Sequence, residues 1–233
     1  MFKRVAIAAA LCAAATTSSA GPVLLQQGFD NVAALAGQGW SLVNKSVATT
    51  ADSTFWQQGN GGLFAAQGGS AGSYAMANYT SSLNGLLQTS GAIENWLITP
   101  LLAAAGGYTV QFYARTEDAA GWADGLEVRS GLVGSDGQLH FDTLVGSLNP
   151  LLEPDGVPGD WTLFSFTANF AAPFSGQLAF VYKADGSSAN LIAIDELNVS
   201  AVPEPASLAL ASLGLCGMAA ARRRRPQATG VAP

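Results

Sequence analysis

The sequence predicts an all-β fold, a jelly-roll-type β-sandwich, with an N-terminal signal peptide before it and a single C-terminal transmembrane helix after it. Within residues 21–202, no stretch keeps the apolar spacing of an amphipathic helix, whereas several short runs alternate apolar and polar side chains. These 182 residues contain 24 glycines, about twice the usual share of roughly 7%. Short alternating runs separated by glycine turns are typical of sandwiches and jelly rolls.

The first twenty residues have the parts of a secretory signal peptide. Lys3 and Arg4 give a positive start, residues 5–15 form an unbroken apolar or small run, and small side chains at Ser18 and Ala20 precede Gly21. A leader of this kind is removed during export. We therefore expect residues 1–20 to be a signal peptide and the remaining chain to be exported.

The strands of residues 21–202 are predicted from period-two alternation and from the glycine turns between them. In residues 109–115, for example, Val110, Phe112 and Ala114 share one face. Further strands are expected at 23–29, 74–79, 95–98, 126–129, 162–168, 178–182 and 192–194. Residues 59–72, rich in Gly, Ala and Ser, are expected to form a long loop. The prediction is eight to ten strands, with the first and last as neighbours.

The C-terminal part of the chain has three consecutive features. Pro203-Glu204-Pro205 comes first, residues 206–221 follow without a charge, and Arg222, Arg223, Arg224 and Arg225 end the run. Sixteen residues span about 24 Å as a helix, slightly less than the roughly 30 Å of a hydrocarbon core. By the positive-inside rule, the arginines keep their flank in the cytoplasm and leave the domain outside. The precursor is thus expected to be anchored in a membrane by a single helix.

This order of features resembles the PEP-CTERM sorting signal of Gram-negative bacteria, over residues 203–225. The resemblance implies recognition by an exosortase-type membrane enzyme, removal of the tail, and transfer to the cell surface or the extracellular exopolysaccharide matrix. Residues 226–233 form a short extra tail after the basic cluster. The cleavage point near Pro203 is left open.

The order of several blocks in residues 28–200 resembles the choice-of-anchor J domain. The blocks are 29–30, 39–42, 55–56, 95–101, 113–115, 123–129, 176–182 and 193–199. That domain is similar to the cleaved-adhesin modules of gingipains, which are jelly-roll sandwiches. Gly125 and Lys183 depart from the pattern of this family. The resemblance implies the fold and leaves any shared surface site open.

Composition excludes several function classes. Residues 21–202 hold 15 acidic and 4 basic side chains, a formal charge of −11, so no basic face remains to bind nucleic acid. Cys12 and Cys216 both lie outside this segment, and His140 is the one histidine of the chain. A zinc site of clustered His and Cys ligands cannot be assembled from these residues.

A calcium site is predicted at Asp30 and Asp195, because the ends of the first and last strands are expected to meet. Ca²⁺ takes six to eight oxygen ligands, and adhesin modules resembling this one bind calcium in such places. Glu196 points away from Asp195 in a flat strand and would join the site only at a bulge. The alternative is that Asp30 caps a turn and Asp195 pairs with an arginine or with backbone amides.

Trp122, between Gly121 and Asp124 in an expected loop, is the candidate for an exposed ring that contacts a glycan. Trp40, Trp96 and Trp161 are expected in the core. Asp124, Glu127 and Arg129 form the most charged cluster, expected on a solvated outer face with Glu127 and Arg129 as an ion pair.

An enzyme is not expected. Residues 68–72 match G-x-S-x-G, but a loop precedes them and a strand is expected after them, whereas a nucleophile elbow needs a strand and then a helix. The leading interpretation is a non-enzymatic surface or extracellular-matrix protein with an adhesion or structural role. The alternatives are a calcium-dependent carbohydrate-binding module and an extracellular hydrolase. The partners expected are the sorting enzyme, the membrane, and exopolysaccharide or surface glycans.

Overall fold

The computed structural model describes residues 21–47, 49–84, 86 and 88–203. One compact unit, Gly21–Val202, contains every strand found in them. The expected signal peptide, the expected transmembrane helix, Glu204, Pro205 and the four arginines lie outside the described residues, whereas Pro203 is described and exposed. No helix in the described part of the chain is long and apolar enough to cross a membrane.

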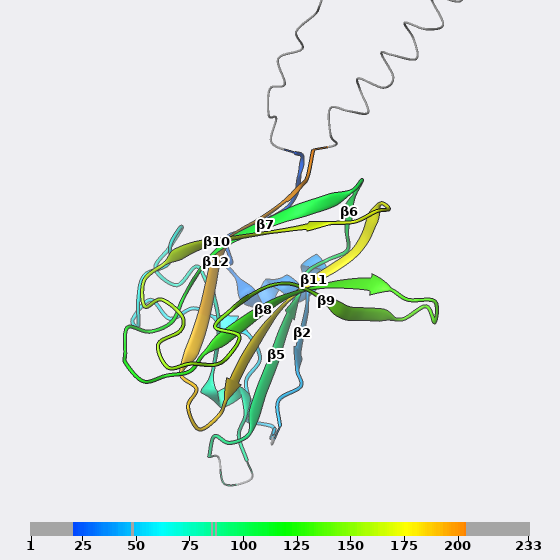
Figure 1. Cartoon of the computed structure of the whole chain (residues 1–233). Helices are drawn as coiled ribbons and strands as arrows, with labels where there is room; N and C mark the ends of the chain where they lie inside the picture. Colours follow the sequence, from blue (N-terminus) through cyan, green and yellow to red (C-terminus); the bar gives the residue numbers. More distant parts are fainter. Residues whose placement is uncertain (1–20, 48, 85, 87, 204–233) are drawn as a thin grey trace, which may run out of the picture. The chain divides into compact units, whose positions relative to one another are not determined.

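The domain is a sandwich of two antiparallel sheets, which confirms the predicted all-β fold (Figure 1). We name them sheet A and sheet B. Sheet A has the order β10 (Thr162–Asn169), β7 (Gly107–Arg115), β12 (Leu191–Ala201), β4 (Ala75–Asn78) and β3 (Gln57–Gln58), and β1 (Val23–Gln27) also pairs with β12. Sheet B has the order β2 (Ser41–Asn44), β5 (Ala92–Ile98), β11 (Phe174–Asp185), β8 (Gly125–Val133) and β9 (Leu139–Leu148), and β6 (Leu102–Ala104) pairs with β11. Two short 3₁₀ helices, η1 (Val32–Gln38) and η2 (Tyr79–Ser81), complete the described elements.

The described part of the domain has twelve strands, more than the eight to ten expected. Each predicted run lies within or overlaps a strand, and the first and last strands pair as expected. The added strands include β3 and β6, of two and three residues, which are too short to show alternation. β9 was not predicted as a whole because its two bulges against β8 interrupt the period of two.

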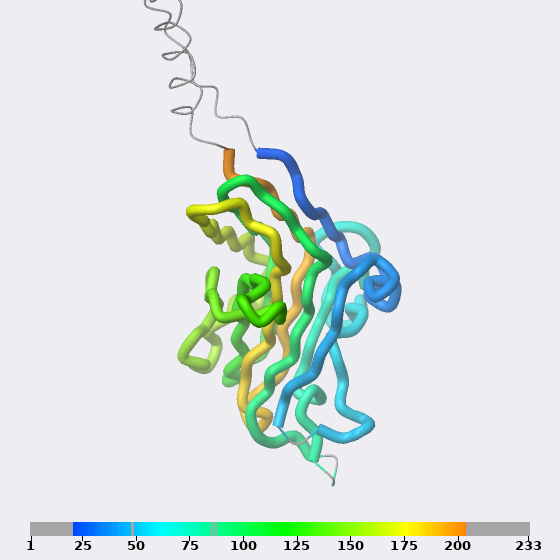
Figure 2. The backbone as a smooth tube through the Cα atoms, turned by 90° about the vertical axis from the view of Figure 1, so that its right-hand side faces the viewer, coloured from blue at the N-terminus to red at the C-terminus, as the bar shows by residue number. Residues whose placement is uncertain are grey.

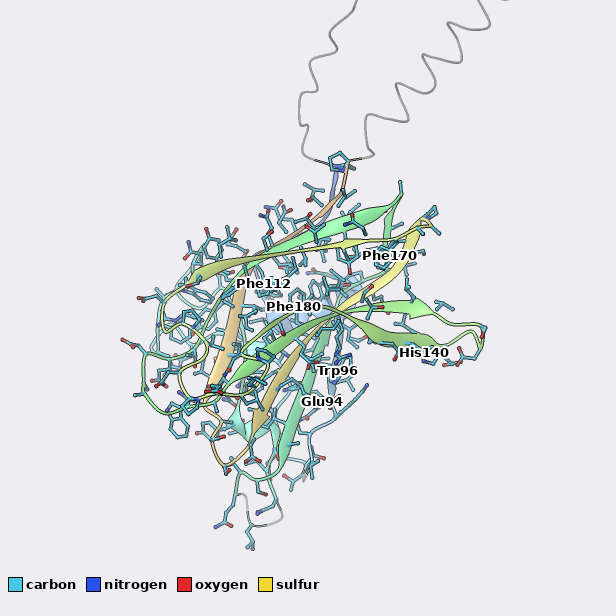
Figure 3. The ribbon with its side chains drawn as sticks, in the orientation of Figure 1. Glu94, Trp96, Phe112, His140, Phe170 and Phe180 are labelled. Carbon is cyan, nitrogen blue, oxygen red and sulfur yellow. The ribbon has the colours of Figure 1, made fainter. Side chains whose placement is uncertain are left out.

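Aromatic rings from the two sheets meet in the core. Phe112 of β7 and Phe180 of β11 are fully buried, and their ring centroids lie 5.2 Å apart at 86° (Figure 3). An edge-to-face pair of this kind contributes about 0.5–1.5 kcal/mol beyond the area that it buries. The alternation of apolar and polar side chains along β7 thus has a structural cause, because one face of this strand packs against sheet B.

The outer face of sheet A is covered by residues 59–73, which form a loop as predicted. Phe64 of this loop stacks on Tyr74 with ring centroids 5.0 Å apart, and the indole N–H of Trp161 donates to the carbonyl of Ala65 over 2.8 Å. The guanidinium carbon of Arg115 lies 4.0 Å from the centroid of Phe64. Because Phe64 of the loop packs against Tyr74, Trp161 and Arg115, the loop buries apolar surface that sheet A would otherwise expose to water.

The two ends of the domain lie side by side (Figure 2). The amide of Ala201 donates to the carbonyl of Pro22 over 2.9 Å, and the amide of Val202 donates to the carbonyl of Gly107 over 3.0 Å. All described strands and the core belong to Gly21–Val202, so this segment is a self-contained folding unit.

Candidate functional site

A groove of about 440 Å³ lies on the outer face of sheet B, and we call it the sheet B groove. Figure 3 labels three of the residues that line it, with Glu94 and Trp96 on β5 and His140 on β9. His140 is exposed on β9. The full lining is Lys45, Glu94, Trp96, Glu127, Arg129, Leu139, His140, Phe141, Asp142 and Lys183.

The floor of the groove is apolar. Trp96 and Val181 are direct partners in the β5–β11 ladder, so their side chains share the outer face, and Phe141 of β9 packs edge-on against Trp96 with centroids 5.5 Å apart. Val181 is fully buried there because these rings cover it. Phe141 lies over Gly131, where an added Cβ would come 2.6 Å from the ring. The glycine therefore permits the ring to reach the floor.

Two ion pairs hold the rim of the groove, one between neighbouring strands and one within a strand. The Nζ atom of Lys183 lies 3.1 Å from Oε2 of Glu94, and Oε1 of the same glutamate accepts a 3.0 Å hydrogen bond from the Trp96 indole. On β8, Nε of Arg129 lies 2.6 Å from Oε2 of Glu127. The expected ion pair of Glu127 and Arg129 is therefore confirmed, and the rim presents donors and acceptors in fixed positions.

Basic residues converge on this groove. Residues 21–202 contain four Lys and Arg in total, and Lys45, Arg129 and Lys183 line it. The ammonium of Lys45 lies 4.0 Å from the centroid of Trp96, a cation–π contact. The fourth basic residue, Arg115, packs against Phe64 of the loop over sheet A. The groove is thus the place in the described domain where cations, carboxylates and aromatic rings meet.

Trp122 is exposed as expected, with 38% of its surface accessible, in the loop between β7 and β8. Its carbonyl accepts a 2.8 Å hydrogen bond from the amide of Asp155, whose carboxylate accepts one from the amide of Gly121 over 2.7 Å. Trp122 does not line the sheet B groove. Its contact with a glycan stays a prediction, separate from the groove.

Asp195 is fully buried in β12, where it anchors the loop over sheet A. Its Oδ2 atom accepts hydrogen bonds from the amides of Gln67 and Gly68 over 2.9 and 3.1 Å, and its Oδ1 atom accepts one from the backbone amide of Glu196 over 2.7 Å. Burial, opposed by these amides, raises the pKa of Asp195 to about 6. Of the two alternatives, the structure contains the pairing of Asp195 with backbone amides.

The predicted calcium ligands lie near one another at a bulge. The register of β12 against β7 shifts between Asp195 and Asn198, and Glu196 has a φ of +48°. Added Cβ atoms at Gly68 and Gly69 would meet Oε1 of Glu196 and Oδ1 of Asp30, at 2.2 and 3.0 Å. Among the described residues, no three His, Cys, Asp or Glu side chains are placed to hold a metal ion together. Whether calcium binds between Asp30 and Asp195 stays a prediction.

Asp124 is not on a solvated face, and this expectation was wrong. It is 2% exposed, and its Oδ1 atom accepts hydrogen bonds from the Tyr182 hydroxyl over 2.5 Å and from the Asn190 amide over 3.0 Å. Burial raises the pKa of Asp124 despite these donors, and burial also raises the pKa of Tyr182 well above its ordinary value. Asp124 thus joins the β7–β8 loop to β11 and β12.

Residues 201–225 match the PEP-CTERM protein-sorting motif. The match confirms the sorting signal expected at Pro203, Glu204, Pro205 and the arginine cluster, and it implies an exported protein that an exosortase sorts to the cell surface. No curated protein matches the chain.

The domain is similar in structure to cleaved adhesin domains. The K1 cleaved adhesin domain of Lys-gingipain from Porphyromonas gingivalis W83 is 19% identical, with a TM-score of 0.52 over 78% of this chain and 99% of that one. The K3 domain is 16% identical, with a TM-score of 0.49 over the same shares. The CBM22-1 xylan-binding domain of Paenibacillus barcinonensis Xyn10C is 15% identical, with a TM-score of 0.43 over 81% of this chain and 100% of that one. The K1 match confirms the cleaved-adhesin-like fold.

Proposed function

We propose that this protein is a non-enzymatic component of the cell surface or extracellular matrix, and that its domain binds a polysaccharide in the sheet B groove. The observation that carries the proposal is the groove, in which ion-paired carboxylates and cations surround the rings of Trp96 and Phe141. The sorting motif supports a position outside the cell. The likeness to an adhesin domain supports an adhesion or structural role.

The chemistry of the groove suits a sugar chain. Sugars present hydroxyl groups that both donate and accept, together with apolar C–H faces. Carboxylate oxygens of Glu94 and Glu127 accept hydrogen bonds from hydroxyls, whereas Lys45 and Arg129 donate them. The ion pairs already fix Glu94, Glu127 and Arg129, so binding loses less side-chain entropy than it would with free side chains.

Binding is favoured over hydrolysis by the partners of the carboxylates. A glycosidase of the common kind needs two carboxyl groups across the scissile bond, one of which delivers a proton. In the groove, Glu94 and Glu127 are each paired with a cation. Asp124 and Asp195, the described carboxyls with raised pKa values, are buried away from the groove lining.

A binding measurement on the 21–202 domain tests the proposal. Pull-down with extracellular polysaccharide, followed by titration calorimetry, should detect binding by the native domain and a loss of about tenfold or more in Glu94→Gln. Glu153→Gln is the matched control, because Glu153 is exposed and lies outside the groove. Trp122→Ala tests the separate exposed ring. Equal affinity of Glu94→Gln and Glu153→Gln contradicts binding in the groove.

Before processing, we propose that apolar residues 206–221 anchor the precursor in the inner membrane and that an exosortase-type enzyme then removes the tail. The length of the run and the four arginines after it support this sequence of events. Fractionation of cells with and without the sorting enzyme is the test. The domain should accumulate in the inner membrane without the enzyme, and a cytosolic protein that keeps Met1 contradicts the proposal.

A structural calcium ion near Asp30 and Asp195 is a second proposal. It is supported by the bulge that directs Glu196 towards Gly68, next to Gly69, where Asp30 lies. The amides use three of the roughly four acceptor positions of Asp195, so one position remains for the ion. Asp30 would supply a second carboxylate, and carbonyl or water oxygens would complete the coordination. Ca²⁺ would link η1, the loop over sheet A and β12. Addition of EDTA should lower the Tm of the native domain and leave that of Asp30→Asn unchanged. An unchanged native Tm contradicts the site.

A further inference from the structure

The end of the domain from which the chain continues into the tail has a distinct surface, which we call the exit pole. It consists of Pro22, residues 105–107, residues 169–173 and Val202. The amide of Phe170 donates to the carbonyl of Gly106 over 2.8 Å, and Pro22 and Gly107 accept from the last residues of the domain. Three separate segments thus meet where the chain leaves (Figures 1 and 2).

The exit pole carries no charge. Residues 21–29, 99–114, 161–182 and 197–203, which supply the pole and the strands that lead to it, contain no Asp, Glu, Lys, Arg or His. All of the −11 formal charge of the domain therefore comes from other segments. Ala105, Ala171, Ala172 and Pro173 are exposed there, and Phe170 stacks on Phe174 beneath them with centroids 5.0 Å apart.

The chain leaves very little distance between this pole and the apolar run. The last backbone hydrogen bond of the domain is made by Val202, and the uncharged run begins at Ala206. Four residues cover at most about 14 Å when fully extended, at roughly 3.5 Å per residue. If residues 206–221 occupy the hydrocarbon core, the exit pole lies close to the headgroup layer.

We infer that the exit pole contacts the lipid headgroup surface while the precursor is anchored, an inference that rests on the membrane anchor proposed above. Anionic lipids repel an acidic domain over a Debye length of about 8 Å. The uncharged pole can approach them without this repulsion, whereas the β7–β8 loop, with Glu117 and Asp118, cannot. The small apolar side chains and the proline of the pole carry no charge whose desolvation would oppose contact with the headgroup layer. In the anchored precursor, the exit pole therefore faces the bilayer, and the charged loops of the domain face away from it.

Fluorescence quenching in vesicles tests the contact. The chain 21–233 with Cys216→Ser is reconstituted in vesicles of phosphatidylethanolamine and phosphatidylglycerol that contain a headgroup nitroxide lipid. A bimane probe is attached at Ala172→Cys and, as the matched control, at Ala120→Cys. Ala120 is exposed in the loop after Arg115, the far end of β7, which lies about 26 Å from Gly107 along the strand at roughly 3.3 Å per residue. We expect at least twofold stronger quenching at position 172, and a decrease when Ala171→Glu is added.

The outcomes separate this inference from the proposed anchor. Equal quenching at the two positions overturns the contact when the chain stays with the vesicles after an alkaline wash, because the anchor is then intact. Loss of the chain in the wash overturns the anchor and the contact with it. Quenching at position 172 that occurs in native membranes but is absent from pure lipid vesicles also overturns the inference, because the pole then contacts a membrane protein and not lipid. Circular dichroism of each variant verifies the fold.

Discussion

The ring of Phe141 occupies the space in which a side chain of residue 131 would stand, and an added Cβ would come 2.6 Å from it. Gly131→Val should therefore displace Phe141 from Trp96 and open the floor of the sheet B groove. We expect polysaccharide affinity to fall by about tenfold and the domain to lose roughly 1–3 kcal/mol of stability, as overpacked sites do. Gly37→Ala is the control, since no heavy atom lies within 4 Å of its added Cβ. Unchanged affinity in Gly131→Val contradicts a role of Phe141 in binding.

The Glu94–Lys183 pair should matter more for binding than for stability. Each side chain is 34% exposed, and partly exposed ion pairs contribute about 0–1 kcal/mol. Lys183→Met should lower the free energy of unfolding by less than about 1 kcal/mol in urea titrations. The same change should reduce polysaccharide affinity severalfold, because Glu94 loses the partner that orients it. A stability loss that accounts for the whole effect on binding would contradict this prediction.

Asp195 should make the domain less stable as the pH rises from about 4 to about 6. Its pKa is raised from 3.8 to about 6, so the native state holds the proton more tightly than the unfolded chain. This contribution is complete below the unfolded pKa and is lost as the pH rises through 6. At about 1.4 kcal/mol per unit, the difference is at most roughly 3 kcal/mol.

The comparison that isolates Asp195 is the unfolding free energy of native protein and Asp195→Asn, measured in EDTA between pH 4 and 7. Between pH 4 and 7, the unfolding free energy of the native protein should fall relative to that of Asp195→Asn. A constant difference between the two contradicts the raised pKa. A native curve that becomes flat when Ca²⁺ is restored would support the calcium site, because a bound cation favours the ionised carboxylate.

Removal of the Tyr182 hydroxyl should destabilise the domain. Tyr182→Phe leaves Oδ1 of buried Asp124 with one fewer donor, which costs about 1–3 kcal/mol. Urea titration of the 21–202 domain measures the change. Tyr79→Phe serves as the control, since Tyr79 is 43% exposed. Equal effects of the two substitutions would show that the Asp124 bond contributes nothing.

The sequence predicts the strands well where alternation has its ordinary cause, one face towards the core. It fails where distant segments decide burial. In the run from Asn95 to Ile98, nothing local distinguishes the inner face from the outer one, and Trp96 is buried on the outer face because Phe141 and Lys45 cover it. Asp124 was misplaced for the same reason, because its partner Tyr182 comes 58 residues later.

The candidate site was predicted only in part. The ion pair of Glu127 and Arg129 follows from their spacing on one strand face. The exposure of Trp122, which lies outside the groove, follows from its place in a loop. The groove needs β5 and β11 to be neighbours, a pairing that brings Glu94 to Lys183 from 89 residues away. The sequence signal for the groove is the scarcity of basic residues in 21–202, because three of the four, Lys45, Arg129 and Lys183, line the groove.

The central place of β12 in sheet A has a mechanical consequence. A tension applied to the domain through its C-terminal end acts along this strand, which is bonded to β7 on one side and to β1 and β4 on the other. Many ladder bonds then share the load in shear instead of opening one after another. Under flow or traction, the domain should therefore stay folded up to a higher force than one whose strands separate one hydrogen bond at a time. Force spectroscopy with handles at Val202 and in the β8–β9 turn would measure the force at which it unfolds.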